Sequence, residues 1–534
     1  MGESAEKNLA PLWDKKRTKK INDLHTLIEE SSNLFGSKTY INPEEEVQNI
    51  SFNELRDFTL KFSRFLENNA INHDEKIAVV AHNSTLMVLL FLSIISNRRI
   101  FVPINPNHSI DEIDYILSDS KPKAIIYDTR LEDKINELNI NFKKIPVADL
   151  SIFIREIFSL SISDDTEESH LPCPDAAAEI VYTSGTTGNP KGVVLTHANL
   201  LADLYGVGEI FKFNSEERFL TVTPLFHNSG QIFTTLIPLW CGATTTAIRS
   251  DMGFISFWYY IDKYNTTWSL VMPAHVNLLL DREQTPQKHT LKGLLCGGAM
   301  LERERQITFE KKFKVPIYNN YGLTESTSIA SCVRPEQKNR ESLGVGKPVC
   351  INKINIYDGR KKAGANEAGE IRIKGPNIFK EYLNKPDFTK KKVVRGWLKT
   401  GDIGRFDDEG NLYILDRIDN MILVGGENVY PFEIEKLLPE LSGLSECILT
   451  SIKHKILGSE LVLVYKLKQK ASADEKRWKN TFYKKLSKFK VPTIFINITD
   501  LGMSDFPRSS NGKILRKKLK DLVESHQLDK KEQK

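Results

Sequence analysis

Helical and strand-like patterns alternate along the first part of the chain. Apolar, strand-like runs at 76–81, 100–104 and 124–127 are separated by segments whose apolar residues recur with helical spacing. Alternation of this kind is typical of βαβ units and of a mostly parallel sheet. The alternation resumes between residues 198 and 296, which predicts a second unit of the same class. The stretch 128–174 is less regular, and we expect it to be a connection.

The hydrophobic period changes to two between residues 351 and 418, where short runs are separated by turn signals. This pattern predicts an antiparallel or barrel-like subdomain. After residue 419 helices and strands mix again over about 110 residues, enough for a small independent domain. We therefore expect an α/β fold. An N-terminal domain, 1–418, contains two βαβ-type subdomains and the small barrel-like β subdomain. A small mobile α+β domain, 419–525, and a disordered tail, 526–534, follow it.

Length and composition are those of an ordinary multidomain globular protein. The 534 residues are too many for one core, and at about 150 residues per domain they suggest roughly three or four structural units. The net charge of +5 gives no case for nucleic-acid binding. The six cysteines are scattered without metal-ligand spacing, which indicates reduced thiols.

The sequence shows no targeting signal that would direct the chain out of the cytoplasm. The first residues are polar and charged, so the sequence shows no secretory signal. The longest apolar run, 86–96, is far shorter than the roughly 20 residues that a transmembrane helix needs. We expect a cytoplasmic protein without a transmembrane segment, and the sequence does not indicate an oligomeric state.

The loop YTSGTTGNPK, residues 182–191, carries the strongest chemical signal. Apolar strand-like runs flank a stretch of hydroxyl residues and glycines that ends in Lys191. Inward-turned amides, hydroxyl donors and an ammonium group can together cradle a polyphosphate. A polar hairpin turn is the alternative, but a turn needs only one or two such residues. Pro190 stands before the lysine and has no amide to donate, so the loop is not a Walker-type P-loop.

Further segments place polar residues beside the ends of predicted strands, with glycine or proline nearby. They are PLFHNSG (224–230), CGGAM (296–300), NNYGLTES (319–326), KTGD (399–402), DRID (416–419), GGENVYPFEIE (425–435) and PRSSNGKILR (507–516).

With these motifs in this order, the chain resembles the adenylate-forming superfamily of acyl-CoA synthetases, firefly-type luciferases and peptide-synthetase adenylation domains over about residues 20–525. The resemblance implies an AMP-forming acid–thiol ligase that uses ATP and Mg²⁺. A carboxylate attacks the α-phosphate, pyrophosphate leaves, and the acyl-adenylate then acylates a thiol. That thiol is expected to belong to coenzyme A, or else to the phosphopantetheine of a carrier protein.

The resemblance also assigns the nucleotide site. It implies that the threonine-rich loop holds the β- and γ-phosphates, that Glu325 and Thr187 serve the Mg²⁺ ion, and that Tyr321 offers a ring face to adenine. The implied nucleotide-binding residues of this part of the chain are Thr183, Ser184, Gly185, Thr186, Thr187, Gly188, Lys191, Gly297, Gly298, Ala299, Asn319, Asn320, Tyr321, Gly322, Leu323 and Thr324.

Other roles carried over from the family lie later in the chain. Asp402 is expected to bind the ribose hydroxyls, with Arg417 close to the ribose or phosphate. Lys513 is the expected catalytic cation, because one ammonium can offset the repulsion between a carboxylate and a phosphate. Asp419 matches the hinge position, although its neighbours depart mildly from the usual family pattern.

Two further assignments concern the thiol half of the reaction. His227 is expected to gate the thiol or shape the acyl pocket. The loop with Gly425, Gly426 and Glu427 is expected to line the pantetheine channel.

The substrate is constrained less closely. Peptide-synthetase domains place an aspartate in the segment that corresponds to 226–235, and this chain has no carboxylate there. An α-amino acid is therefore disfavoured, and a fatty or aromatic acid is expected as the small-molecule substrate. Three alternatives stay open: transfer to a carrier protein or an amine, a non-catalytic nucleotide-binding regulator, and a luciferase-like oxygenation.

Overall fold

The computed structural model describes residues 13, 15–139, 142–162, 173–183, 190–249, 254–282, 288–508 and 514–532. The chain divides into two compact units, the first made of 1–355, 372–400 and 407–413 and the second of 356–371, 401–406 and 414–534. Parts of the predicted barrel-like subdomain group with the second unit, and the predicted domain boundary after residue 418 stays a prediction.

One sheet of the first unit has seven strands in the order β19-β8-β7-β4-β3-β5-β6. Neighbours from β7 through β4, β3 and β5 to β6 run parallel, whereas β8 is antiparallel to both β7 and β19. The strands are β3 (Lys76–Val80), β4 (Ile100–Ile104), β5 (Ala124–Asp128), β6 (Lys143–Val147), β7 (Ala177–Thr183), β8 (Lys191–Thr196) and β19 (Glu381–Tyr382).

A second sheet of the first unit has nine strands in the order β15-β14-β13-β12-β11-β9-β10-β1-β2. Its central strands are parallel, and antiparallel strands close both edges. The strands are β1 (Thr39–Ile41), β2 (Ile50–Ser51), β9 (Arg218–Thr221), β10 (Thr244–Ala247), β11 (Trp268–Val271), β12 (Gly293–Cys296), β13 (Ile317–Tyr321), β14 (Ser331–Cys332) and β15 (Lys347–Pro348).

The helices of the first unit follow from their side-chain patterns. α4 (Thr85–Ser96) is buried on every side, as its nearly continuous apolar sequence requires. α3 (Phe52–Asn68) is amphipathic and begins with a capping box between Ser51 and Glu54. The other helices that matter below are α5 (Ile110–Ser120), α9 (His197–Phe211), α10 (Asn228–Gln231), α11 (Ile237–Cys241), α14 (Pro273–Leu280), α15 (Arg303–Phe313) and α16 (Pro386–Lys392).

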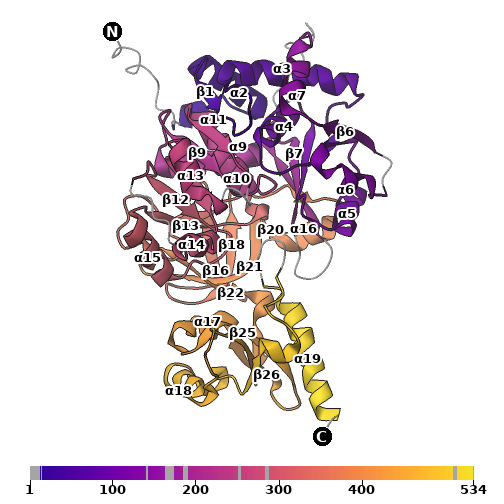
Figure 1. Ribbon diagram of the computed structural model, residues 1–534. Helices are drawn as coiled ribbons and strands as arrows, with labels where there is room; N and C mark the ends of the chain where they lie inside the picture. The colour runs from indigo at the N-terminus through magenta and orange to yellow at the C-terminus, as the bar shows by residue number, and fades with distance from the viewer. Residues whose placement is uncertain are drawn as a thin grey trace. The chain divides into compact units, whose positions relative to one another are not determined.

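The predicted α/β class with two parallel-sheet subdomains is confirmed. Figure 1 shows these sheets and helices in colours that run from indigo through magenta to orange, with α16 in orange. The stretch 128–174, expected to be a connection, instead contributes the edge strand β6 and the helix α7 (Leu150–Ser159). α7 packs phenylalanines against α3, including Phe153 against Phe58 and Phe65. The apolar residues of this stretch are spread among charged ones, which concealed both elements.

The predicted period-two region forms a six-stranded sheet in the order β17-β16-β18-β21-β20, with β22 paired to β21. Along β18 every second residue is buried, which is the alternation expected of a strand with one covered face. The strands are β16 (Lys353–Asp358), β17 (Lys361–Lys362), β18 (Gly369–Lys374), β20 (Val393–Val394), β21 (Trp397–Phe406) and β22 (Leu412–Arg417).

The end of the chain, orange to yellow in Figure 1, has two small sheets. β25, β26 and β27 form one sheet, and β23 and β24 form a hairpin. The predicted tail is helical through residue 532, since α19 does not stop at residue 525. The elements are β23 (Ile422–Val424), β24 (Glu427–Val429), α17 (Pro431–Glu435), β25 (Leu444–His454), β26 (Gly458–Leu467), α18 (Glu475–Lys485), β27 (Ile494–Asn497) and α19 (Arg516–Glu532).

We searched the described helices for one that could span a membrane. Within the described ranges, every helix is too short or too polar to cross a bilayer.

Candidate active site

The threonine-rich loop connects the antiparallel strands β7 and β8. Thr183 pairs with Lys191 as the last register position before the loop. A Cβ atom at Gly192 would stand 2.9 Å from Ile180 and 3.1 Å from the Tyr182 ring, so a larger residue does not fit at this position of β8. The loop residues Ser184, Gly185, Thr186, Thr187 and Gly188 lie outside the described part of the chain. The strands thus place Lys191 at the mouth of the hairpin.

Two aromatic rings surround the Lys191 ammonium. Its Nζ lies 5.9 Å from the ring centroid of Tyr382 and 5.1 Å from that of Phe388. These distances are within the range of a cation–π attraction. Tyr382 comes from β19, which pairs with β8 at Val193 and Val194. The pairing of short strands therefore brings residues far apart in sequence to the phosphate-loop lysine.

Glu325 lies in the short 3-10 helix η4 (Thr324–Ser326) and contacts the same tyrosine. The Tyr382 hydroxyl donates to Glu325 Oε1 at 2.6 Å, and the Phe379 amide donates to the Glu325 carbonyl at 3.0 Å. Across the described ranges no group of three or more His, Cys, Asp or Glu side chains is arranged to hold a metal ion. Mg²⁺ usually takes one or two carboxylates plus phosphate oxygens, and the half-buried carboxylate of Glu325 fits that donor set.

A buried carboxyl from α9 supports the loop that carries Glu325. Asp203 accepts hydrogen bonds from the Ile329 amide at 3.2 Å and from Asn377 Nδ2 at 2.9 Å. Asn377 in turn donates to the Ser326 carbonyl at 3.0 Å. Burial raises the pKa of the Asp203 carboxyl to about 7. Asp203 and Asn377 were not among the predicted residues. The sequence signal for Asp203 was a single aspartate among the apolar residues of a helical pattern.

The ends of β12 and β13 bring the predicted adenine-side residues together. Cys296 and Asn319 are register partners, and Asn320 Nδ2 donates to the Cys296 carbonyl at 3.0 Å. A side chain at Gly297 would stand 2.3 Å from Asn320 Oδ1, and one at Gly322 would stand 1.5 Å from a backbone carbonyl oxygen. The two glycines are therefore required by close packing.

Other residues of this region differ in their exposure and in their hydrogen-bond partners. Tyr321 is 9% exposed, so most of its ring, expected to face adenine, is covered. Asn319 Nδ2 donates to Gln306 Oε1 at 2.8 Å, and Gln306, fully buried on α15, also donates to the Ile317 carbonyl. Gln306 is a supporting residue that the motifs did not reveal. Gly298 has φ +79°, a left-handed conformation that favours glycine.

His227 precedes α10 with extended backbone, and its ring lies 4.8 Å from that of Phe226. Behind it, Asn228 Nδ2 donates to Glu179 Oε1 at 2.5 Å and to Gln231 Oε1 at 3.2 Å. Burial raises the pKa of the Glu179 carboxyl to about 8, so this carboxyl is largely protonated near neutral pH. A π-helical turn, Ile232–Leu236, follows, and such turns are frequent at functional sites.

The second unit pairs two predicted nucleotide residues. Arg417 Nη1 lies 2.9 Å from Asp402 Oδ1, and the Asp402 side chain is almost fully buried. Asp416 holds the following turn, because its carboxylate accepts from Asn420 Nδ2 and from the Phe432 amide, both at 2.9 Å. Asp419, the expected hinge residue, is exposed in a 3-10 turn.

The hairpin of β23 and β24 turns at Gly425 and Gly426. Val424 pairs with Glu427, and the two glycines have φ +60° and +89°. Positive φ at both positions is the requirement of a type I′ turn, which explains the glycine pair. Glu427 is exposed at the start of β24.

Lys513 lies outside the described residues. The chain beyond it is anchored at Arg516, which donates to both carboxylate oxygens of Glu435 at 2.7 and 2.6 Å and to the Leu449 carbonyl at 3.1 Å. Arg508 and Ile514 form an isolated antiparallel bridge. The described residues on either side of Lys513, Arg508 and Ile514, are thus paired with each other, and both belong to the second unit.

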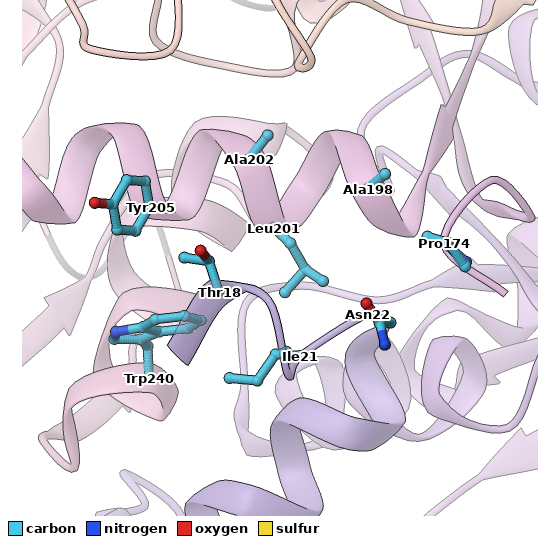
Figure 2. A pocket seen from close by; sticks show the side chains of 9 residues that line it. All are labelled: Thr18, Ile21, Asn22, Pro174, Ala198, Leu201, Ala202, Tyr205 and Trp240. Carbon is cyan, nitrogen blue, oxygen red and sulfur yellow. The ribbon is translucent and has the colours of Figure 1, made fainter. Parts of the chain in front are cut away.

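A hollow of about 250 Å³ is lined by other residues of the chain (Figure 2). One wall is a single face of α9, formed by Ala198, Leu201, Ala202 and Tyr205, and Thr18, Ile21 and Trp240 lie across from it. Asp203 is not among its lining residues. The hollow contains none of the predicted site residues, so it does not mark the chemistry.

The chain is similar to known proteins over most of its length. The family model of the AMP-binding enzymes matches residues 28–383. The chain is 29% identical over 480 residues to the oxalate–CoA ligase of Arabidopsis thaliana, covering 88% of this chain and 91% of that protein. It is 28% identical over 521 residues to the crotonobetaine/carnitine–CoA ligase of Citrobacter koseri, covering 93% and 99%.

Among solved structures, one similar chain is the O-succinylbenzoate coenzyme A synthetase of Bacillus subtilis in complex with ATP and a magnesium ion. The two share 25% identity at a TM-score of 0.79, over 92% of this chain and 99% of that one. These relatives extend over nearly the whole chain, including the part beyond the family match.

Proposed function

The chain belongs to the AMP-binding enzyme family, and from this premise we propose that it is an AMP-forming acid–thiol ligase. In the first half of the reaction a carboxylate oxygen attacks the α-phosphorus of ATP, and the bond to the β-phosphate breaks with loss of pyrophosphate. In the second half the thiol of coenzyme A attacks the acyl carbonyl carbon. The thioester forms, the thiol proton is lost to solvent, and AMP leaves with the oxygen that attacked.

The observation that carries this proposal is the convergence of Lys191 and Glu325 on Tyr382. One charge is suited to phosphate oxygens and the other to a hydrated divalent cation. A bound Mg²⁺ would neutralise and orient the polyphosphate, with Glu325 as its protein ligand. Thr187 is proposed as a second contact to that ion.

The remaining roles are assigned to residues other than Lys191, Glu325 and Thr187. Asp402 accepts from the ribose hydroxyls, and Arg417, which holds its carboxylate at 2.9 Å, contributes positive charge beside it. Lys513 offsets the repulsion between carboxylate and phosphate during the attack. The Gly425–Glu427 turn serves the pantetheine arm. His227 shapes the path between acyl pocket and thiol, with Glu179 and Asn228 fixing its loop.

The acid is proposed to be fatty or aromatic and to lack an α-amino group. The buried carboxyl next to the PLFHNSG segment is Glu179, which is engaged by Asn228 and largely neutral. It is therefore not suited to pair with an ammonium group. A reducing compartment, such as the cytoplasm, is proposed because Cys241, Cys296 and Cys332 are buried thiols.

The test is a pyrophosphate-release screen over fatty, aromatic, dicarboxylic and amino acids, with AMP and thioester followed by mass spectrometry. The expected result is acid-dependent AMP formation and an acyl-CoA. Reaction with a phosphopantetheinylated carrier protein but not with coenzyme A would move the proposal to its carrier-loading alternative. Tight ATP binding with no AMP for any acid would overturn it in favour of a non-catalytic nucleotide-binding protein.

A further inference from the structure

Tyr382 contacts both charged residues of the proposed phosphate and metal site. Its hydroxyl donates to Glu325 Oε1 at 2.6 Å, and its ring centroid lies 5.9 Å from Lys191 Nζ. Glu325, Lys191 and Tyr382 come from three separate segments of the chain. The tyrosine is therefore the point at which these segments meet.

The position of Tyr382 is fixed from several sides. It is 5% exposed, and its strand β19 pairs with β8 two residues beyond Lys191. The ring of Phe379 packs against it at 4.7 Å, and the Phe379 amide donates to the Glu325 carbonyl. The Tyr382 amide donates to the Thr389 hydroxyl at 2.9 Å, which ties it to α16. A side chain this constrained can hold its partners in place.

The contacts also keep two opposite charges apart. Among the ion pairs of the described residues, with a limit of 4.0 Å between nitrogen and oxygen, there is none between Lys191 and Glu325. Such a pair would neutralise the ammonium needed by phosphate and the carboxylate needed by a cation. The Tyr382 hydroxyl instead donates to Oε1 of Glu325, and we assign Oε2 as the oxygen for a metal ion. The rings of Tyr382 and Phe388 hold the ammonium without neutralising it.

We propose that Tyr382 is a positioning residue that acts on the metal carboxylate through its hydroxyl and on the phosphate-loop lysine through its ring. This inference rests on the proposed function of the same site. Groups that orient a metal ligand typically affect metal affinity by about 10- to 100-fold when they are removed. The hydroxyl and the ring can be removed separately, so the two halves of the proposal can be tested separately.

The experiment measures ATP affinity by calorimetry, without acid substrate, in Mg²⁺ and in EDTA. Tyr382→Phe removes the hydroxyl and keeps the ring, whereas Tyr382→Leu removes both. Tyr413→Phe is the matched control, because its hydroxyl also lies near a carboxylate, that of Asp407 at 3.3 Å. Phe388→Leu tests the ring contact at a side chain that is 52% exposed and so does not support the core.

In the phenylalanine variant, the gain in ATP affinity on adding Mg²⁺ should shrink by about 10-fold or more, while affinity in EDTA stays unchanged. Tyr382→Leu and Phe388→Leu should also weaken ATP binding in EDTA. Equal Mg²⁺ dependence in wild type and Tyr382→Phe overturns the hydroxyl role. Unchanged EDTA affinity in both Tyr382→Leu and Phe388→Leu overturns the ring role.

The same data separate this inference from the proposed function. A wild-type chain whose ATP binding does not respond to Mg²⁺ contradicts the proposed function itself. A wild-type chain that responds normally, beside a Tyr382→Phe chain that responds equally, contradicts the role of Tyr382 alone. If the phenylalanine variant does not fold, Phe388→Leu still decides the ring half, and Mn²⁺ paramagnetic resonance of wild type against Glu325→Gln decides whether that carboxylate binds the ion.

Discussion

The buried carboxyl of Asp203 leads to a pH-dependent prediction. It accepts from the Ile329 amide and from Asn377 Nδ2 beneath the loop that carries Glu325. In Asp203→Asn one side-chain oxygen becomes an amide donor, so one of these donors faces another donor. Leaving a buried amide without its acceptor costs about 1–3 kcal/mol. The Asn377 amide keeps the Ser326 carbonyl as an acceptor, so the loss falls chiefly on Ile329.

The size of this loss depends on pH. Burial raises the pKa of Asp203 from 3.8 to about 7 in the folded state. The native protein therefore binds more protons than the unfolded chain between about pH 4 and 7, and its stability falls as pH rises through that window. Integrated between pH 5 and 8, this carboxyl contributes about 2.5 kcal/mol of stability that is present at pH 5 and absent at pH 8. The side-chain amide of the Asp203→Asn variant does not titrate.

The assay is thermal unfolding of wild type and Asp203→Asn from pH 5 to pH 8. The excess of the wild-type Tm over that of the variant should be largest at pH 5 and shrink by about 2 °C towards pH 8, given an unfolding entropy of about 2.1 cal/mol/K per residue. Glu179→Gln is a useful second variant, since its carboxyl also has a raised pKa, of about 8, but lies behind His227. A difference in Tm between wild type and Asp203→Asn that is constant with pH would contradict the raised pKa of the Asp203 carboxyl. Equal stability of the two proteins at every pH would show that the Asp203 hydrogen bonds do not stabilise the loop that carries Glu325.

Three other predictions concern single residues. Gly322→Ala should prevent stable folding, because the new Cβ would stand 1.5 Å from a backbone oxygen, whereas Gly364→Ala, with its nearest neighbour at 3.5 Å, should unfold like wild type in the same thermal scan. Asp402→Asn should raise the KM for ATP by about 10-fold through loss of a charge-assisted contact. An unchanged KM would show that the Asp402–Arg417 pair does not contribute to ATP binding. Lys513→Ala should slow pyrophosphate release by on the order of 10²–10³-fold with ATP affinity retained in calorimetry, and unchanged release would remove the lysine from the first half-reaction.

The parallel strands were predictable because buried strands between helices have an unmistakable pattern. β4 begins and ends at the residues that its apolar run predicts, and β5 begins at the predicted residue and extends one residue further. The helix α15 was missed because most of its residues are charged and only Gln306, Phe309 and Phe313 are buried. The final helix was missed because its lysine-rich composition is also that of a solvated tail.

The site was predictable only where its residues form compact motifs. The glycines at 297 and 322 were recognised from sequence, and packing explains why no larger residue fits there. Tyr382, Asp203 and Gln306 act from strands and helices whose sequences carry no motif. Their importance depends on which distant segments pair with them, and local sequence does not record that pairing.

The most direct test of the central claim follows one oxygen atom. A carboxylic acid that is a substrate is labelled with ¹⁸O in its carboxylate and incubated with the enzyme, MgATP and coenzyme A. Attack of the carboxylate on the α-phosphorus predicts that ¹⁸O appears in AMP and that pyrophosphate carries none. Label in inorganic phosphate, or an acyl-CoA formed with unlabelled AMP, would contradict the account.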